Sequence, residues 1–128
     1  MKNKKLLIID DDPSIRFILQ SILKNDYETE IKENAYEALV YMQEGNIPDA
    51  IISDITMPKL SGQDFLEIVK SSYYFKNIPF IFLSGKEDSQ ERVECLKKGA
   101  DDYLLKPFNP EELLIRIFKL FKPLSHVQ

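Results

Sequence analysis

Four short apolar runs, each followed at once by a polar residue, dominate the pattern along this chain. Each run and its polar end are Leu6–Ile9 with Asp10 and Asp11, Ala50–Ser53 with Asp54, Phe80–Leu83 with Ser84, and Tyr103–Leu105 with Lys106. Unbroken apolar runs of this length are typical of strands that a parallel sheet buries on both faces. A further strand is indicated over Tyr27–Lys32, where polarity alternates as it does on an exposed edge.

Segments with helical periodicity separate these strands. The first begins at Asp12-Pro13 and the last at Asn109-Pro110, each a capping residue followed by a proline that suits the first helical turn. The fourth helix is expected over Ser89–Lys98. This helix is weakly apolar, and its expected anchors in the core are Val93, Cys95 and Leu96.

Five strands alternating with five helices predict an α/β fold with a parallel sheet and helices on both faces. The three most apolar strands should be central and the more polar second and fifth strands should be edges. The predicted order is therefore 2-1-3-4-5, which is the flavodoxin-like doubly wound fold. Its switch point lies between the first and third strands and brings Asp10 and Asp11 beside Asp54. A carboxylate at the end of the third strand is expected to be exposed at the edge where such sheets bind ligands.

The composition fits one globular domain of 128 residues, and we expect it to span residues 1–122, with 123–128 a tail or the start of a linker. The net charge of −4 argues against nucleic-acid binding. The single cysteine, Cys95, fits a reducing cytoplasmic location and is expected to be an inert, partly buried thiol. The basic stretch Met1–Lys5 precedes only four apolar residues, too few for a signal peptide or a membrane span.

Three carboxylates converging at one edge repel one another, and a divalent cation removes the conflict. Mg²⁺ (or Mn²⁺) prefers oxygen ligands and is commonly held by a few carboxylates together with a phosphate. We expect Asp10 and Asp11 to be ligands, Asp54 to be shared with a phosphoryl group, and the backbone carbonyl of Thr56 to add an oxygen. The alternative is that the aspartate run is only a polar strand end and helix cap, and for Asp12 the cap is the preferred interpretation.

The same edge offers the parts of a phosphoryl-transfer site, with Asp54 as the nucleophile. A carboxylate that attacks phosphorus forms an acyl phosphate. Lys106 supplies a positive charge, Ser84 a hydroxyl, and Gly85 a backbone N–H free of side-chain bulk. Taken alone, Lys106 could be a surface lysine and Ser84 a turn residue; their joint placement with the aspartates favours the catalytic interpretation.

These residues form a recognisable set of motifs over residues 4–121. They are Leu7–Pro13, Ser53–Pro58 with Gly62, Phe82–Gly85 and Gly99–Phe108. In this order and spacing the chain resembles the receiver domain of bacterial two-component response regulators, of the chemotaxis type. The resemblance implies a signalling switch that catalyses only its own phosphorylation and dephosphorylation.

The resemblance also implies roles for individual residues. Asp54 would be phosphorylated by a histidine kinase or a histidine phosphotransfer protein in a Mg²⁺-dependent phosphorelay. Ser84 and Tyr103 would be the switch pair, with the tyrosine ring swinging inward when Ser84 moves to the phosphoryl group. The peptide between Lys106 and Pro107 would be cis. The alternative for Tyr103 is an edge-strand aromatic packed on the last helix.

Two departures from the family pattern are small. Serine at Ser84 and glycine at Gly85 replace a commoner threonine and alanine, and both keep the hydroxyl and the small residue. Thr56 and Lys86 occupy variable positions that, in the family, tune the lifetime of the phosphoryl group.

A charged face is expected on the fourth helix, fifth strand and fifth helix. In transcription-factor relatives this face forms a dimer, and here a change in it would control a downstream effector protein or an output domain. We expect phosphorylation-driven homodimerisation through pairs between Arg92 and Glu112 and between Asp102 and Arg116. The alternative is a solvated charged surface, because such pairs are individually weak.

Two other functions compete with this interpretation. A haloacid-dehalogenase-type phosphatase also uses an aspartyl phosphate, but it needs a second aspartate two residues after the nucleophile, where this chain has Thr56. The second competing function is that of a pseudo-receiver, which binds a partner without being phosphorylated.

Overall fold

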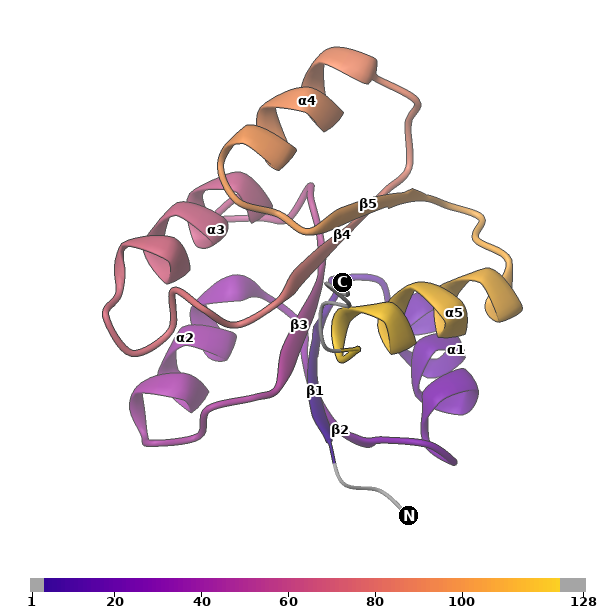
Figure 1. The fold of residues 1–128 in the computed structure, drawn as a ribbon, viewed down its shortest axis with the longest axis horizontal. Helices are drawn as coiled ribbons and strands as arrows, with labels where there is room; N and C mark the ends of the chain where they lie inside the picture. Colours follow the sequence, from indigo (N-terminus) through magenta and orange to yellow (C-terminus); the bar gives the residue numbers. More distant parts are fainter. Residues whose placement is uncertain (1–3, 123–128) are drawn as a thin grey trace, which may run out of the picture.

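The computed structural model describes residues 4–122 and contains five strands that alternate with five helices (Figure 1). The strands are β1 (Lys5–Ile9), β2 (Glu28–Lys32), β3 (Ala50–Asp54), β4 (Phe80–Ser84) and β5 (Asp102–Leu105). The helices are α1 (Pro13–Leu23), α2 (Ala35–Gln43), α3 (Gly62–Ser71), α4 (Ser89–Lys97) and α5 (Pro110–Leu120). The tail expected over 123–128 lies outside the described residues.

All five strands pair in parallel, in the order β2-β1-β3-β4-β5. Helices α2, α3 and α4 cover one face of the sheet and α1 and α5 cover the other (Figure 1). The predicted fold class and strand order are therefore confirmed. Ile9 pairs with Ser53 in the register of β1 and β3, so Asp10 and Asp54, which follow them, emerge side by side.

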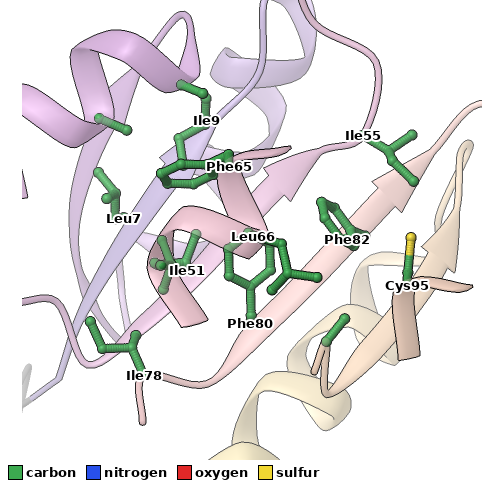
Figure 2. Packing of buried hydrophobic residues seen from close by; sticks show 14 of the residues in the cluster. Leu7, Ile9, Ile51, Ile55, Phe65, Leu66, Ile78, Phe80, Phe82 and Cys95 are labelled. Carbon is green, nitrogen blue, oxygen red and sulfur yellow. The ribbon is translucent and has the colours of Figure 1, made fainter. Parts of the chain in front are cut away.

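The core on the α2-α3-α4 face is built around three phenylalanines. Phe82 lies 4.9 Å from Phe80 between ring centroids, and Phe80 lies 5.6 Å from Phe65 of α3. Leu66 and Ile51 pack around them, and Cys95 of α4 closes the end of this cluster near Phe82 (Figure 2). These rings bury the apolar area that holds α3 on the sheet.

The core on the other face is aliphatic. Its fully buried members are Leu6, Ile8, Leu19, Leu23, Ala50, Ile52, Ile81, Leu83, Leu113 and Ile117. Alternate residues of β1 and β3 supply both clusters, because successive strand side chains point to opposite faces. A sheet buried in this way on both faces leaves its strand ends as the natural place for polar groups.

The helix starts behave as the sequence predicts. Asp12 accepts a hydrogen bond from the Ser14 N–H at 2.8 Å, and Asn109 accepts from the N–H groups of Glu111 and Glu112 at the start of α5. The peptide between Lys106 and Pro107 is cis. Within residues 4–122, every helix is too short or too polar to cross a bilayer.

Helix α4 differs from the sequence-based expectation. Of its three expected anchors only Cys95 is buried, whereas Val93 is 45% exposed and Leu96 is 44% exposed. The prediction that all three enter the core was wrong. The helix lies over the β4-β5 margin of the sheet, where only one of its side chains reaches the core.

Candidate functional site

The predicted site residues meet at the carboxyl edge of the sheet. Asp10 follows β1, Asp54 ends β3, Ser84 ends β4 and Lys106 follows β5. In the strand register, Asp54 pairs with Leu83 and Ser84 pairs with Leu105, which aligns the ends of β3, β4 and β5. Residues separated by up to 96 positions in the chain thus come together, as in the contact between Lys106 and Asp10.

Three carboxylates form the acidic centre of this edge. Asp10, Asp11 and Asp54 each offer an oxygen, and these oxygens lie within 4.8 Å of one another. Asp11 is exposed and Asp10 is fully buried. Asp54 is only 6% exposed, so the expectation that it lies open at the strand end was wrong. Lys106 and the other carboxylates of the cluster lie next to it.

Lys106 bridges the two buried carboxylates. Its Nζ lies 2.9 Å from Oδ2 of Asp10 and 3.2 Å from Oδ1 of Asp54. Burial on its own would lower the pKa of Lys106, but the hydrogen bond and charge of Asp10, followed by those of Asp54, outweigh it and raise the pKa. The ammonium therefore stays charged and holds both carboxylates in place.

Asp54 has the most perturbed acidity among these groups. Burial and then the charge of Asp10 raise its pKa to about 6, and Lys106 offsets part of the effect. Removal from water and repulsion from a like charge both disfavour the ionised form. A cation at the cluster would remove this repulsion, so the donor set fits a hard divalent ion such as Mg²⁺.

Backbone hydrogen bonds fix the orientation of the two buried carboxylates. Oδ1 of Asp54 accepts from the Ile55 N–H at 3.0 Å, and Oδ1 of Asp10 accepts from the Asp12 N–H at 2.9 Å. Within residues 4–122, no hydrogen bond engages Oδ2 of Asp54.

Arg16 of α1 donates to the Asp10 carbonyl at 2.7 Å. Sequence reasoning missed Arg16, since a contact six residues away along the chain has no motif of its own.

Gly62 allows the chain after β3 to close over the end of the strand. Its N–H donates to the Ile55 carbonyl at 2.9 Å. A Cβ added at Gly62 would lie 2.7 Å from the Asp54 carbonyl oxygen and 2.7 Å from the Ile55 Cα, both backbone atoms. Only glycine fits here, and the close approach keeps α3 against the strand that carries Asp54.

Ser84 lies at the end of β4 and is engaged with the following loop. It is fully buried, and its Oγ donates to the Lys86 carbonyl at 3.1 Å and accepts from the Lys86 N–H at 3.3 Å. Gly85 and Lys86 are exposed, as is Thr56 after β3. The two positions expected to tune the lifetime of the phosphoryl group therefore both lie in exposed loops at this edge.

Tyr103 of β5 is buried against α4. It is 8% exposed, and its hydroxyl donates to Oε1 of Glu91 at 2.8 Å. Burial raises the pKa of Tyr103 to about 12. Sequence reasoning named Tyr103 but not Glu91, because no pattern along the chain reveals which α4 side chain faces β5.

The charged face expected on α4, β5 and α5 contains pairs within one chain. Arg116 lies 2.8 Å from Oδ1 of Asp102 and 2.9 Å from Oε2 of Glu112. Arg92 lies with Glu112 and Arg116 along a surface cavity of about 430 Å³. All four residues thus share one surface.

This fold and site together define an α/β domain with a carboxylate cluster, contacted by a lysine, at the carboxyl edge of its sheet. A family model described as the response regulator receiver domain matches residues 6–118. The chain belongs to the response regulator receiver domain family. Receiver domains bind Mg²⁺ at an acidic cluster, and Asp10, Asp11 and Asp54 form such a cluster here.

Relatives show the same domain in different proteins. The chain is 36% identical over 110 residues to response regulator Rre1 of Synechocystis, an alignment that covers 84% of this chain and 47% of Rre1. It is 35% identical over 116 residues to the sensor histidine kinase TmoS of Ectopseudomonas mendocina, covering 91% of this chain and 12% of TmoS. The chain thus spans less than half the length of either relative.

A solved structure matches the fold over nearly the whole chain. The chemotaxis response regulator CheY4 of Vibrio cholerae superimposes with a TM-score of 0.85 at 34% identity, covering 92% of this chain and 98% of CheY4. The receiver fold predicted from the sequence is therefore confirmed.

Proposed function

We propose that this chain is a phosphorylation-controlled signalling switch and that Asp54 is the residue that accepts the phosphoryl group. One observation carries the proposal. Asp54 belongs to the carboxylate cluster with Asp10 and Asp11 and contacts Lys106, and Ser84 ends the adjacent strand. Its Oδ1 is held by the Ile55 N–H and Lys106, and Oδ2 is the oxygen left to react.

In the proposed reaction Oδ2 of Asp54 attacks the phosphorus of a phosphohistidine on a histidine kinase or a phosphotransfer protein. An O–P bond forms and the N–P bond breaks, and the imidazole nitrogen leaves with the electron pair and takes a proton from water. Lys106 remains protonated throughout and balances charge on the phosphoryl oxygens. Ser84 donates a hydrogen bond to one of those oxygens and keeps its proton, with the Gly85 N–H beside it.

The acidic cluster supports a metal-dependent version of this reaction. Asp10, Asp11 and Asp54, with the Thr56 carbonyl, would hold Mg²⁺ or Mn²⁺. When bound, such an ion neutralises charge on the transferring group and on the clustered carboxylates.

The switch is proposed to start at Ser84. To reach a phosphoryl group on Asp54, its hydroxyl must give up the two hydrogen bonds with Lys86. That change shifts the loop leading into α4, and Tyr103 under α4 responds to it. The output is a changed surface on α4, β5 and α5, which acts on a downstream effector, an output domain or a second copy of the chain.

The experiment that tests the function is intact-mass analysis after incubation with acetyl phosphate and Mg²⁺. We expect one phosphoryl adduct on the wild-type protein, and no adduct on Asp54→Asn or when EDTA is added. Circular dichroism of each sample shows that the protein is folded. A folded wild-type protein without an adduct would contradict the proposal and favour a pseudo-receiver that binds its partner constitutively.

A further inference from the structure

We propose that Glu91 is a positioning residue of the switch, whose carboxylate holds Tyr103 in its buried position and ties α4 to β5. The inference rests on the proposed function, since it concerns how the site on Asp54 reaches α4. It adds a residue that the sequence motifs do not contain.

The hydrogen bond between Tyr103 and Glu91 is short, and the backbone of each residue is fixed by its own helix or strand. The Tyr103 hydroxyl donates to Oε1 of Glu91 at 2.8 Å, within the range of a strong hydrogen bond to a charged acceptor. Asp88 caps α4 by accepting from the Glu91 N–H at 3.1 Å, which fixes the backbone at this position. Tyr103 lies in β5 and pairs with Phe82 of β4.

Helix α4 has few other attachments. Its one buried side chain is Cys95. Near its carboxyl end Lys98 contacts Glu67 of α3 at 2.8 Å and Gln63 at 2.9 Å. Among the described residues, 4–122, the Tyr103–Glu91 hydrogen bond is therefore the side-chain hydrogen bond that joins the amino-terminal half of α4 to the sheet, and this half adjoins the Ser84 loop.

Tyr103 also connects this attachment to the site. Tyr103 pairs with Phe82 of β4, two residues before Ser84 on the same strand, and its hydroxyl donates to Glu91 on α4. Burial raises the pKa of the phenol above its ordinary value. Because the phenol stays protonated near neutral pH, it remains a donor to Glu91. Tyr103 thus lies between the hydroxyl expected to move and the helix expected to respond.

The charge of Glu91 favours the buried rotamer of Tyr103. Removal of the carboxylate leaves the buried hydroxyl without this acceptor, so the equilibrium constant for the buried rotamer should fall. For a charge-assisted hydrogen bond at a partly exposed position we expect a decrease of about three- to tenfold.

The test is ¹⁹F NMR of the 128-residue protein labelled with 3-fluorotyrosine. Tyr103→Phe assigns the Tyr103 resonance, and the strongly exposed Tyr73 and Tyr74 mark the solvent-exposed end of the shift range. In Glu91→Ala we expect the Tyr103 resonance to move toward that end, and in Glu91→Gln to move part of the way. Glu94→Gln is the matched control, since it removes the same charge from an exposed position on the same helix and should leave the resonance unchanged.

An unchanged Tyr103 resonance in a folded Glu91→Ala protein would overturn the proposal. If that variant does not fold, Glu91→Gln decides by the same criterion. The measurement requires no phosphorylation, so its result does not depend on whether the proposed function is correct.

A second measurement connects the contact to the switch. With acetyl phosphate and Mg²⁺, Glu91→Ala should slow phosphoryl-adduct formation by about the factor that ¹⁹F NMR gives for Tyr103. An unchanged rate would overturn the role of Glu91 in the switch. The absence of an adduct even on the wild-type protein would overturn the proposed function, whereas the NMR result would still decide whether Glu91 positions Tyr103.

Discussion

Asp54 is the residue at which function and stability conflict. Its pKa of about 6 lies above the ordinary value of 3.8 because of burial and the charge of Asp10. The folded protein therefore binds this proton more tightly than the unfolded chain does. The free energy of unfolding therefore decreases as pH rises from about 4 to 6, because the buried carboxyl group loses its proton. Above pH 6 the destabilisation by the ionised Asp54 is complete.

Replacing Asp54 by asparagine should therefore stabilise the metal-free protein. In EDTA at pH 8 we expect Asp54→Asn to raise the free energy of unfolding by about 2 to 3 kcal/mol, and the gain should disappear near pH 4. Urea unfolding at both pH values measures it. Asp26→Asn, at an exposed position, is the control and should have little effect at either pH. An Asp54→Asn protein no more stable than wild type at pH 8 would contradict this electrostatic account.

A second prediction concerns Gly62 and rests on steric contact rather than on charge. A methyl group at Gly62 meets backbone atoms at 2.7 Å, whereas a methyl group at Gly85 meets no atom within 4 Å. We expect Gly62→Ala to lower the free energy of unfolding by about 1–3 kcal/mol. Gly85→Ala, as the matched control, should leave it nearly unchanged. Equal midpoints for the two variants in urea would show that the chain after β3 moves aside easily.

Which site residues the sequence reveals depends on where they lie in the chain. Asp10, Asp54 and Lys106 come directly at or after strand ends, so the parallel topology alone brings them together. Arg16 and Glu91 lie within helices, and their contacts depend on helix rotation and rotamers. No period along the sequence encodes these, which is why only the structure shows them.

At the scale of elements, the loops after β3 and β4 should control the lifetime of the phosphoryl group. Thr56 and Lys86 are exposed in these loops, so their side chains are free to obstruct or assist a water that attacks the phosphoryl group. We expect Thr56→Asn or Lys86→Glu to change the dephosphorylation rate at least about threefold, about 0.7 kcal/mol of barrier, without preventing phosphorylation. The decay of the adduct by intact mass measures this rate. Unchanged decay in both variants would refute the assignment.

The elements themselves were largely predictable, with one instructive exception. The predicted α4, Ser89–Lys98, ends one residue beyond the observed helix, yet Val93 and Leu96 are exposed. Apolar periodicity predicts where a helix forms but not how closely the helix packs. In α3, Phe65 and Leu66 meet the ring cluster of β4, whereas α4 lies over the margin of the sheet and inserts one side chain.

For the whole molecule, the charged face on α4, β5 and α5 leads to a prediction about oligomerisation. Arg116 is paired within the chain to Asp102 and Glu112, so a dimer that uses these residues must exchange partners across its two-fold axis. We expect sedimentation velocity to show a monomer that becomes a dimer with acetyl phosphate and Mg²⁺. Arg116→Ala should weaken the dimer by at most a few-fold, since exposed pairs contribute about 0–1 kcal/mol each. A monomer in both states would exclude this output.

The single cysteine has a practical consequence. Cys95 belongs to α4, and its side chain is fully buried between this helix and the sheet. Burial raises the pKa of its thiol to about 11, so the folded protein offers almost no reactive thiolate. Reaction with an aromatic disulfide reagent then requires α4 to lift from the sheet. Because the chain has no other thiol, the labelling rate measures how often this one helix opens. The protein thus contains its own reporter of α4, and a kinase, an effector or a second copy that clamps the helix would be detected as slower labelling without any engineered probe.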